Sequence, residues 1–357
     1  MLQTITSASE PSIEGFHQPA EWEKHDAVWL AWPSHGELWQ ENLRPAQEEF
    51  ISFCEAIADF DPKLGRHRGE RLHVLVPNIV AGQQAEKELS HLPVRIFLIP
   101  FGDIWLRDTA PIFLRRGAEI ATASFEFNGW GEKYNLPDDL TVSKKISSEA
   151  GFTQFVLPWI LEGGSIEVDG EGTCLTSRQC LLNPNRNPGL SQAEIEAKLK
   201  QSLGVQKVLW LEEGLRNDHT DGHIDTIARL VSPATVLCMK ATTPDDPNKD
   251  VYDKIALDLS KMTDAQQRKL TVGYIPSPGA ILNDDGDLMP ASYLNFYIGN
   301  STVVVPTYGS PMDELAVEAI AKWFPGRRTV GCMAKSILTG GGAFHCISQQ
   351  QPAKEIV

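Results

Sequence analysis

A recurring order of elements constrains the fold of this chain more than any other feature of its sequence. Short apolar runs typical of strands and longer amphipathic segments typical of helices follow one another as strand, strand, helix, strand. This order recurs about five times, at intervals of roughly 60–70 residues. No glycine-rich phosphate-binding turn follows a strand, which argues against a dinucleotide-binding fold. The alternation predicts an α/β protein, and a radial arrangement of the units would direct their loops toward one central site.

The predicted elements cover most of the chain. The clearest is a helix that Ser191 caps, with Glu194 completing a capping box and Gly204 ending the helix. No low-complexity linker interrupts the chain, so we expect a flexible N-terminal arm at residues 1–16 and a single domain at residues 17–357. The other predicted helices span 45–60, 83–91, 142–150, 251–262 and 312–324, and the predicted strands span 27–32, 72–77, 94–100, 105–115, 119–127, 155–161, 165–168, 173–177, 207–211, 224–231, 235–239, 270–275, 292–298, 302–306 and 329–334.

Charge and cysteine content limit the partners and the compartment. The 357 residues carry a net charge of −15, which argues against nucleic-acid binding and against an anionic membrane surface, and which suits a small cationic ligand. The six cysteines form no Cys-x-x-Cys pair, so we expect reduced thiols. No stretch approaches about 18 consecutive apolar residues, and residues 1–15 lack the apolar core of a secretory signal. These features predict a cytoplasmic protein without a membrane-spanning segment.

A glycine-rich stretch near the C-terminus contains a candidate nucleophile. Gly340, Gly341 and Gly342 permit backbone conformations that a Cβ atom would forbid, and Cys346 follows four positions later. A thiol beside a glycine-rich turn can act as a nucleophile. A loop followed by a buried cysteine explains the same residues equally well, because free cysteine is among the most buried residue types.

A second polar cluster spans residues 217–225 and contains His219, His223 and Asp225. These three side chains could ligate a metal. However, Gly222 disfavours the helix on which two histidines four residues apart chelate well, and no other cluster completes the ligand shell. Alternatively, His223 is an acid/base and Asp225 is its charge partner, since residues i and i+2 share a face in an extended segment. A solvated polar loop is the third interpretation.

Two further carboxylates lie at or near predicted strand ends. Asp108 lies in the apolar stretch 105–111, where a buried carboxylate needs a partner. Arg107 is a poor partner, because adjacent residues on a strand point to opposite faces. Glu162 precedes two glycines, where a glutamate is often only a turn residue.

Together, one thiol, one imidazole and three carboxylates suit a planar cation. Guanidinium offers five N–H donors in a fixed fork, and two carboxylates can each bind it through paired hydrogen bonds. A thiolate at Cys346 could then attack the central carbon of the cation. The residue types therefore indicate a guanidino ligand.

The sequence also resembles the family that comprises agmatine deiminases and bacterial (Porphyromonas-type) peptidylarginine deiminases. The likeness covers nearly the whole chain, and its motifs occur in the family's order. The resemblance implies the pentein fold, an α/β propeller of five ββαβ units around a pseudo-fivefold axis with the active site at its centre. The motifs that carry it occupy residues 19–33, 105–111, 127–131, 161–166, 183–188, 220–225 and 340–350.

The resemblance assigns roles to individual residues. It implies that Cys346 is the nucleophile, that His223 is the general acid/base, and that Asp108 and Asp225 grip the guanidinium group. Glu162 falls on a family glutamate near the histidine and the substrate. The remaining substrate-binding positions that the resemblance implies are Trp105, His219 and Gly341.

By this resemblance the chain hydrolyses a small cationic guanidino substrate, agmatine in the first place, to N-carbamoylputrescine and ammonia, without a metal or organic cofactor. Two positions depart from the family's pattern. Ala343 stands where many agmatine deiminases carry Asn, and His219 stands where they often carry an acidic residue. An aminobutyl tail favours a carboxylate there, so free or peptidyl arginine is the alternative substrate. A guanidine- or polyamine-binding protein without catalysis is the alternative of another class. Family members are often dimers or larger, which leaves a homo-oligomer open.

Overall fold

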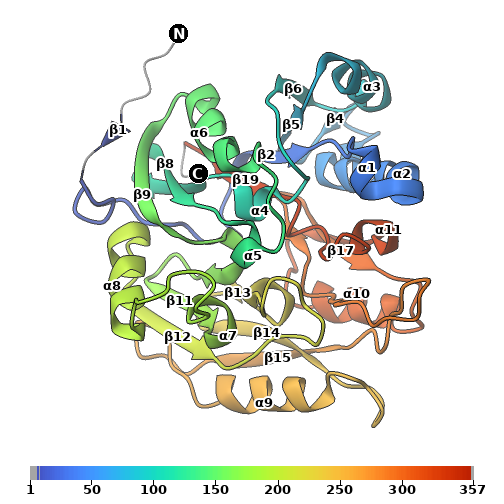
Figure 1. Ribbon diagram of the computed structural model, residues 1–357. Coiled ribbons are helices and arrows are strands. Elements are labelled where there is room, and N and C mark those ends of the chain that lie inside the picture. Colours follow the sequence, from blue (N-terminus) through green and yellow to red (C-terminus); the bar gives the residue numbers. More distant parts are fainter. Residues whose placement is uncertain (1–5, 8, 355–357) are drawn as a thin grey trace.

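The computed structural model describes residues 6, 7 and 9–354, and its sheets are arranged as a ring around a common centre (Figure 1). Five of the sheets contain three or four strands. The sixth is a small hairpin of β3 (Phe60–Asp61) and β4 (Arg66–His67). Each of the five larger sheets, with its helices, is one unit of the ring, so the predicted repetition of an α/β unit is confirmed.

Four units follow one another along the chain and share one topology. In each unit the first two strands pair antiparallel, and the third pairs parallel with the second. A helix connects the two parallel strands, because a parallel pair requires a long crossover connection. The units comprise β7 (Ile112–Arg116), β8 (Glu119–Glu126), α6 (Asp139–Ala150) and β9 (Thr153–Ile160); β10 (Ile166–Val168), β11 (Thr173–Ser177), α8 (Gln192–Leu203) and β12 (Lys207–Leu211); β13 (Ala228–Ser232), β14 (Thr235–Lys240), α9 (Lys249–Leu259) and β15 (Thr271–Pro276); and β16 (Tyr297–Ile298), β17 (Thr302–Thr307), α10 (Asp313–Ala321) and β18 (Arg328–Met333).

The first unit takes one strand from the far end of the chain. Its sheet has the order β19, β2, β5, β6, and β19 (Gln349–Pro352) pairs antiparallel with β2 (His25–Ala31). The helices α2 (Leu43–Ala58) and α3 (Ile79–Leu89) connect β2 to β5 (Arg71–Val76) and β5 to β6 (Val94–Leu98). The last strand predicted from the sequence ends at residue 334, so β19 is an additional element. It closes the ring.

Three predicted strands differ from the structure. The strand predicted at 105–115 is instead the short helix α4 (Leu106–Thr109) followed by β7. The strand predicted at 224–231 begins with the 3₁₀-helix η3 (Ile224–Thr226), and that predicted at 292–298 is reduced to β16. In the first two segments the backbone forms local hydrogen bonds of the helical type. Thr109 N donates to Trp105 O at 3.2 Å, and Ile227 N donates to Ile224 O at 3.0 Å. A short apolar run does not distinguish a buried turn from a buried strand.

The capped helix is α8, and its capping residues are as predicted. The Ser191 side chain accepts a hydrogen bond from Glu194 N, the Glu194 carboxylate accepts one from Ser191 N, and Gly204 ends the helix with φ of 70°. A left-handed residue at this position is reached most easily by glycine.

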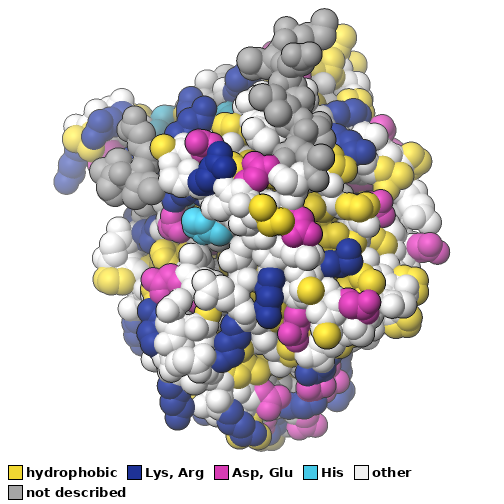
Figure 2. Space-filling view, turned by 90° about the vertical axis from the view of Figure 1, so that its left-hand side faces the viewer, with side chains coloured by type: hydrophobic (Ala, Val, Ile, Leu, Met, Phe, Trp, Pro, Cys, Tyr) yellow, Lys and Arg dark blue, Asp and Glu magenta, His cyan; other side chains and the backbone are white. Residues whose placement is uncertain are grey.

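The predicted N-terminal arm lies partly outside the described residues. Within its described part, β1 (Thr6–Ser7) pairs parallel with β9, and the buried ring of Phe16 packs edge-on against Phe155 at 5.5 Å. The domain boundary at residue 17 stays a prediction. None of the described helices is long and apolar enough to cross a membrane. Figure 2 shows one face of the molecule, on which basic and acidic side chains are interspersed.

A buried ionic network joins the units at the centre of the ring. Glu21 accepts hydrogen bonds from Arg107 Nη1 at 3.0 Å, from Arg229 Nη2 at 2.6 Å and from His345 Nε2 at 2.8 Å. Arg229 also pairs with Glu167 at 3.0 Å. All five side chains are buried. Each charge therefore depends on its partners, since an unpaired charge in the interior is strongly destabilising.

Replacing Glu21 with alanine leaves Arg107 without its carboxylate partner and Arg229 with Glu167 alone. We expect the free energy of unfolding, measured by urea denaturation, to fall by about 3–5 kcal/mol. The matched control is Glu119→Ala, which removes the exposed partner of Arg116 and should lower the free energy far less. Equal losses in the two variants would contradict the structural role of the central network.

Candidate functional site

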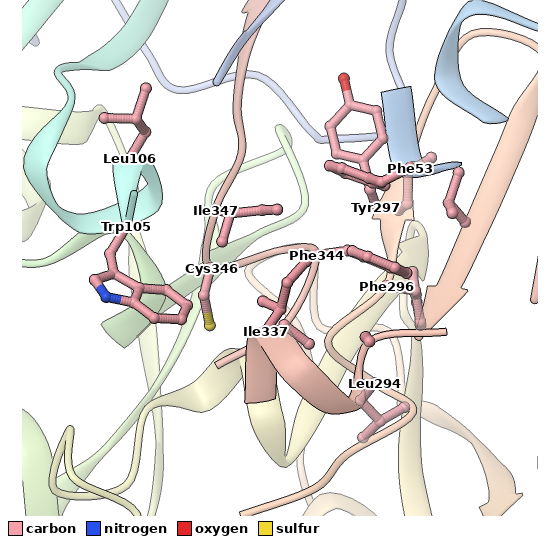
Figure 3. Packing of buried hydrophobic residues seen from close by; sticks show 14 of the residues in the cluster. Phe53, Trp105, Leu106, Leu294, Phe296, Tyr297, Ile337, Phe344, Cys346 and Ile347 are labelled. Carbon is pink, nitrogen blue, oxygen red and sulfur yellow. The ribbon is translucent and has the colours of Figure 1, made fainter. Parts of the chain in front are cut away.

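Cys346 lies in the segment that leads from the short helix α11 (Lys335–Leu338) through the glycines into β19. Asn295 holds this segment, because its Oδ1 accepts hydrogen bonds from the backbone N–H groups of Ala343, His345 and Cys346 at 3.1–3.2 Å. Its Nδ2 donates to the sulfur of Cys346 at 3.0 Å. Figure 3 shows the Cys346 side chain between Trp105 and Ile337, while the ring of Phe344 lies farther into the core. The thiol is buried but borders a cavity.

The carboxylate of Asp108 is fixed by two donors. Asp108 Oδ2 accepts a hydrogen bond from Trp130 Nε1 at 2.8 Å, and Oδ1 accepts one from Gly164 N at 2.9 Å. Trp130 lies in the short helical segment α5 (Gly129–Glu132) with φ of 54°, a left-handed conformation that few non-glycine residues adopt. A strained backbone thus directs the indole at the carboxylate. The structure corrects the predicted strand position of Asp108, since it lies in α4.

Asp225 lies between the nucleophile candidate and the ionic network. Its Oδ2 is 2.7 Å from His345 Nδ1 and 3.5 Å from Cys346 Sγ. On the opposite side of the imidazole, His345 Nε2 contacts Glu21. Because carboxylates only accept hydrogen bonds, both nitrogens of His345 donate. Asp225 Oδ1 is buried without a hydrogen-bond partner among the described residues.

His223 is fully buried beside Asp108, with 3.8 Å between Nδ1 and Asp108 Oδ2. It precedes η3, so His223 and Asp225 do not share a face of a strand as predicted. Gly164 lies against His223, Asp108 and Asp225. A Cβ at Gly164 would lie 2.5 Å from His223 Nδ1, 3.0 Å from Asp108 Oδ1 and 3.1 Å from Asp225 Oδ2. Only a residue without a side chain fits between these three groups.

Glu162 is fully buried and pairs with Arg186, whose Nε is 2.7 Å from Glu162 Oε1. Arg186 also pairs with Asp221 at 2.7 Å, so the segment 183–188 serves to place this arginine. Glu162 Oε2 has no hydrogen-bond partner among the described residues, and the imidazole of His223 contacts the Cys180 thiol. A buried polar atom in a protein is rarely left unpaired, so Glu162 Oε2 indicates a bound group.

Burial and neighbouring groups set the pKa values of Cys346, His223 and Asp225. Burial raises the pKa of the Cys346 thiol well above its usual value, and the charges of Asp225 and Asp108 raise it further. Burial alone would lower the pKa of His223, but the charge of Asp108 and the contacts with Cys180 and Glu162 hold it well above its usual value. Burial also opposes ionisation of Asp225, whose pKa is nevertheless lowered by His345.

A cavity of about 280 Å³ leads to the thiol. The indoles of Trp105 and Trp130 line it, together with the ring of Tyr134, and Asp108 and Cys346 lie at its inner end. Asp103 Oδ2 accepts a hydrogen bond from Trp105 Nε1 at 2.8 Å and thereby orients this wall. A larger cavity of about 920 Å³ adjoins the first and shares four lining residues with it, namely Tyr134, His219, Thr339 and Gly341.

His219 lies at the boundary of the two cavities, apart from His223 and Asp225. Its Nδ1 is 2.8 Å from the hydroxyl of Tyr134, and the two rings are stacked. The metal set considered from the sequence, His219 with His223 and Asp225, is therefore not assembled in the described part of the chain. Gly341 faces His219 with φ of 102°.

The structure thus brings Cys346, His223, Asp108, Asp225 and Glu162 to one centre, with Trp105, His219 and Gly341 lining the approach. Sequence reasoning missed Asn295, His345, Trp130 and Gly164 as parts of this site. Asn295 and Trp130 lie about 50 and 200 residues from Cys346 in the chain, so no local pattern connects them to the thiol. The available signals were the position of His345 beside Cys346 and the motifs at 127–131 and 161–166, which contain Trp130 and Gly164.

Comparison with known proteins identifies the family of the chain. The model of the Porphyromonas-type peptidyl-arginine deiminase family matches residues 17–352. The chain belongs to this family. An agmatine deiminase from Ectopseudomonas mendocina (strain ymp) is 36% identical over 99% of this chain and 100% of its own length.

Solved structures of family members have the same architecture. The agmatine deiminase of Enterococcus faecalis superimposes with a TM-score of 0.90 at 32% identity, covering 99% of this chain and 100% of that one. An agmatine deiminase of C. jejuni with substrate bound, a cysteine-to-serine variant, has a TM-score of 0.84 at 27% identity and covers 94% and 96% of the two chains. The expected pentein fold is confirmed by these comparisons and by the five-unit ring.

Adding one methyl group at Gly164 tests the geometry of the centre. In Gly164→Ala the methyl group collides with His223, Asp108 and Asp225, so we expect kcat/KM of the reaction proposed below to fall by about 10²-fold or more. The matched control is Gly326→Ala, where a Cβ meets nothing within 4 Å and should leave activity unchanged. Full activity in Gly164→Ala would mean that these three groups do not act together.

Proposed function

We propose that this protein is a cysteine-dependent hydrolytic deiminase of a guanidino substrate, and that its substrate is agmatine, which it converts to N-carbamoylputrescine and ammonia. The observation that carries the proposal is the pair of buried carboxylate oxygens at the reaction centre that have no hydrogen-bond partner among the described residues, Asp225 Oδ1 and Glu162 Oε2. A guanidinium group has five N–H donors in one plane and a positive charge. It satisfies the carboxylate oxygens and balances their charge.

The substrate cation also activates the nucleophile. In the free protein, burial and two carboxylates favour the neutral thiol of Cys346. A guanidinium bound between Asp108 and Asp225 places a positive charge beside the sulfur, which favours the thiolate. The thiol proton passes to solvent as the cation enters, so the reactive species forms only when the substrate is in place. The N–H of Asn295 further stabilises the sulfur anion.

The reaction then proceeds in two stages. The thiolate attacks the guanidinium carbon and forms a C–S bond, and His223 as imidazolium donates a proton to the departing nitrogen, which leaves as ammonia. An S-alkylthiouronium remains attached to Cys346. Water, deprotonated by the now neutral His223, adds to the same carbon, the C–S bond breaks, and the thiolate is regenerated. In the overall reaction, one guanidinium group and one water molecule give one ureido group and one ammonium ion.

The shape of the approach supports agmatine. Trp105, Trp130, Leu38 and Leu136 line the inner cavity and suit an unbranched aliphatic chain. Family members named as agmatine deiminases match this chain along almost its full length. Peptidyl arginine is the second candidate, and the 920 Å³ cavity next to the inner one favours it, because a peptide backbone needs such space. The six free thiols suit the reducing cytoplasm, which is the compartment that we propose.

Removing the nucleophile separates binding from chemistry. We expect Cys346→Ser to lose turnover of agmatine by several orders of magnitude while it still binds the substrate, because a hydroxyl is a far weaker nucleophile than a thiolate. Ammonia release and calorimetric binding measure the two effects. The same ammonia assay with free arginine and an arginyl peptide identifies the preferred substrate. Near-normal rates in Cys346→Ser would exclude the covalent route, and no turnover of any of the three by the wild-type protein would exclude the deiminase.

Variants of His223 and His219, which lie four residues apart, distinguish the acid/base residue from a histidine that takes no part in proton transfer. His223→Ala removes both protonation of the leaving ammonia and activation of water, so we expect kcat to fall by about 10²–10⁴-fold. His219→Ala is the matched control, because His219 is exposed at the cavity boundary and should change mainly KM. Equal losses of kcat in the two variants would contradict the assigned role of His223.

A further inference from the structure

Behind the reaction centre lies a cluster that the proposed chemistry does not use fully. One ligand atom each of Glu162, Cys180 and His223 lies within 4.8 Å of the others, and all three side chains are fully buried. We infer that these three residues form a site for a zinc ion, and that zinc bound there inhibits the enzyme. The inhibition rests on the proposed function, whereas the metal site itself does not.

The three ligands are held in place by separate elements. Cys180 lies in the short helix α7 (Arg178–Leu181), which the side chain of Ser177 caps by accepting a hydrogen bond from Cys180 N at 3.2 Å. Glu162 directly precedes the 3₁₀-helix η2 (Gly163–Ser165), and His223 directly precedes η3. The Cys180 thiol faces the imidazole of His223. No step of the proposed reaction requires a second thiol at this place.

Two of the three residues have coordination capacity to spare. Among the described residues, Arg186 occupies Glu162 Oε1 and leaves Oε2 without a partner, and the imidazole of His223 contacts only a thiol that is itself one of the three ligands. Cysteine sulfur, imidazole nitrogen and a carboxylate oxygen are the ligands that zinc takes in proteins. A thiolate disfavours the hard ions calcium and magnesium. The donor set therefore selects a soft or borderline ion.

The dimensions and charges suit this ion. Zinc bonds of roughly 2.0–2.3 Å place tetrahedral ligand atoms about 3–4 Å apart, so a shift of about 1 Å or less per side chain closes the site. One thiolate, one carboxylate and one neutral imidazole balance the two positive charges. The thiol proton of Cys180 and the proton of the imidazolium pass to solvent when the ion binds. Water can fill the fourth position, and Asp108 Oδ2 lies 3.8 Å from His223 Nδ1 as an alternative ligand.

The consequence for catalysis is direct. A zinc ion on His223 occupies the lone pair that activates water and prevents the ring from carrying the proton for the departing ammonia. The ion also takes the Glu162 oxygen that we assign to the substrate cation. Zinc and substrate are thus alternative occupants of one centre. The nucleophile Cys346 is not required for the metal.

A second group of potential ligands, Glu21, Glu167 and His345, does not form a comparable site. Arg107 and Arg229 already pair with these carboxylates and would repel a cation. The site at Glu162 contains one arginine, Arg186, whose charge is shared with Asp221. Of the two groups, Glu162, Cys180 and His223 are therefore the better zinc ligands.

Binding of zinc and of cobalt to four proteins tests the site. The proteins are the wild type, Cys180→Ala, Cys346→Ser and Cys238→Ala, the last being a control for a buried thiol that belongs to neither cluster. We expect the wild type, Cys346→Ser and Cys238→Ala to bind one zinc ion, and Cys180→Ala to bind it about 10²-fold more weakly in calorimetry. With cobalt, the sulfur-to-metal charge-transfer band should be lost only in Cys180→Ala. Zinc inhibition of agmatine hydrolysis should need about 10²-fold more zinc in Cys180→Ala than in Cys238→Ala.

Three results overturn the inference. Normal binding by Cys180→Ala together with loss in Cys346→Ser would place the ion on the nucleophile. Absence of zinc binding by the folded wild type would remove the site. Equal inhibition of Cys180→Ala and Cys238→Ala would remove the regulatory role. The binding and cobalt measurements do not depend on turnover. If the protein proves to have no deiminase activity, these measurements still test the metal site.

Discussion

The structure depends on the need to pair every charge that is buried at the centre of the ring. Glu21 binds two arginines and His345, and His345 in turn holds Asp225, so the charge of the structural network is linked to the reaction centre through one imidazole. At Asp225 Oδ1 and Glu162 Oε2, the described part of the chain provides no hydrogen-bond partner. A cationic ligand completes the pairing there. Stability and binding are thus two parts of one electrostatic arrangement.

Closure of the ring and formation of the site are coupled by the order of residues in the chain. Cys346 lies three residues before β19, the strand that completes the first sheet by pairing with β2. Asn295, which precedes β16, fixes the intervening backbone and contacts the sulfur. The nucleophile is therefore placed only when the two ends of the chain have met.

Much of the fold follows from sequence periodicity, and much of the site does not. The strands and helices of the repeated units follow from apolar spacing and caps, as in α8, where Ser191 and Gly204 mark both ends. By contrast, α4 and η3 are short, buried helical turns of mixed polar and apolar residues that tertiary contacts stabilise, and β19 is rich in glutamine. Residue type sufficed to single out Cys346, His223 and the carboxylates, because thiols, imidazoles and acids are chemically distinctive. Asn295 and Gly164 act through hydrogen bonding and absence of a side chain, which only the three-dimensional contacts reveal.

The most direct test of this account is the ionisation state of Cys346 with and without a cation. The difference in ultraviolet thiolate absorbance between the wild type and Cys346→Ser measures it at neutral pH. The account predicts almost no thiolate signal in the free protein, because burial and the charges of Asp225 and Asp108 raise the pKa of the thiol. Addition of guanidinium ion at a non-denaturing concentration should produce the signal, and the same concentration of sodium ion should not. A thiolate already present in the free protein, or no change with guanidinium, would contradict the account.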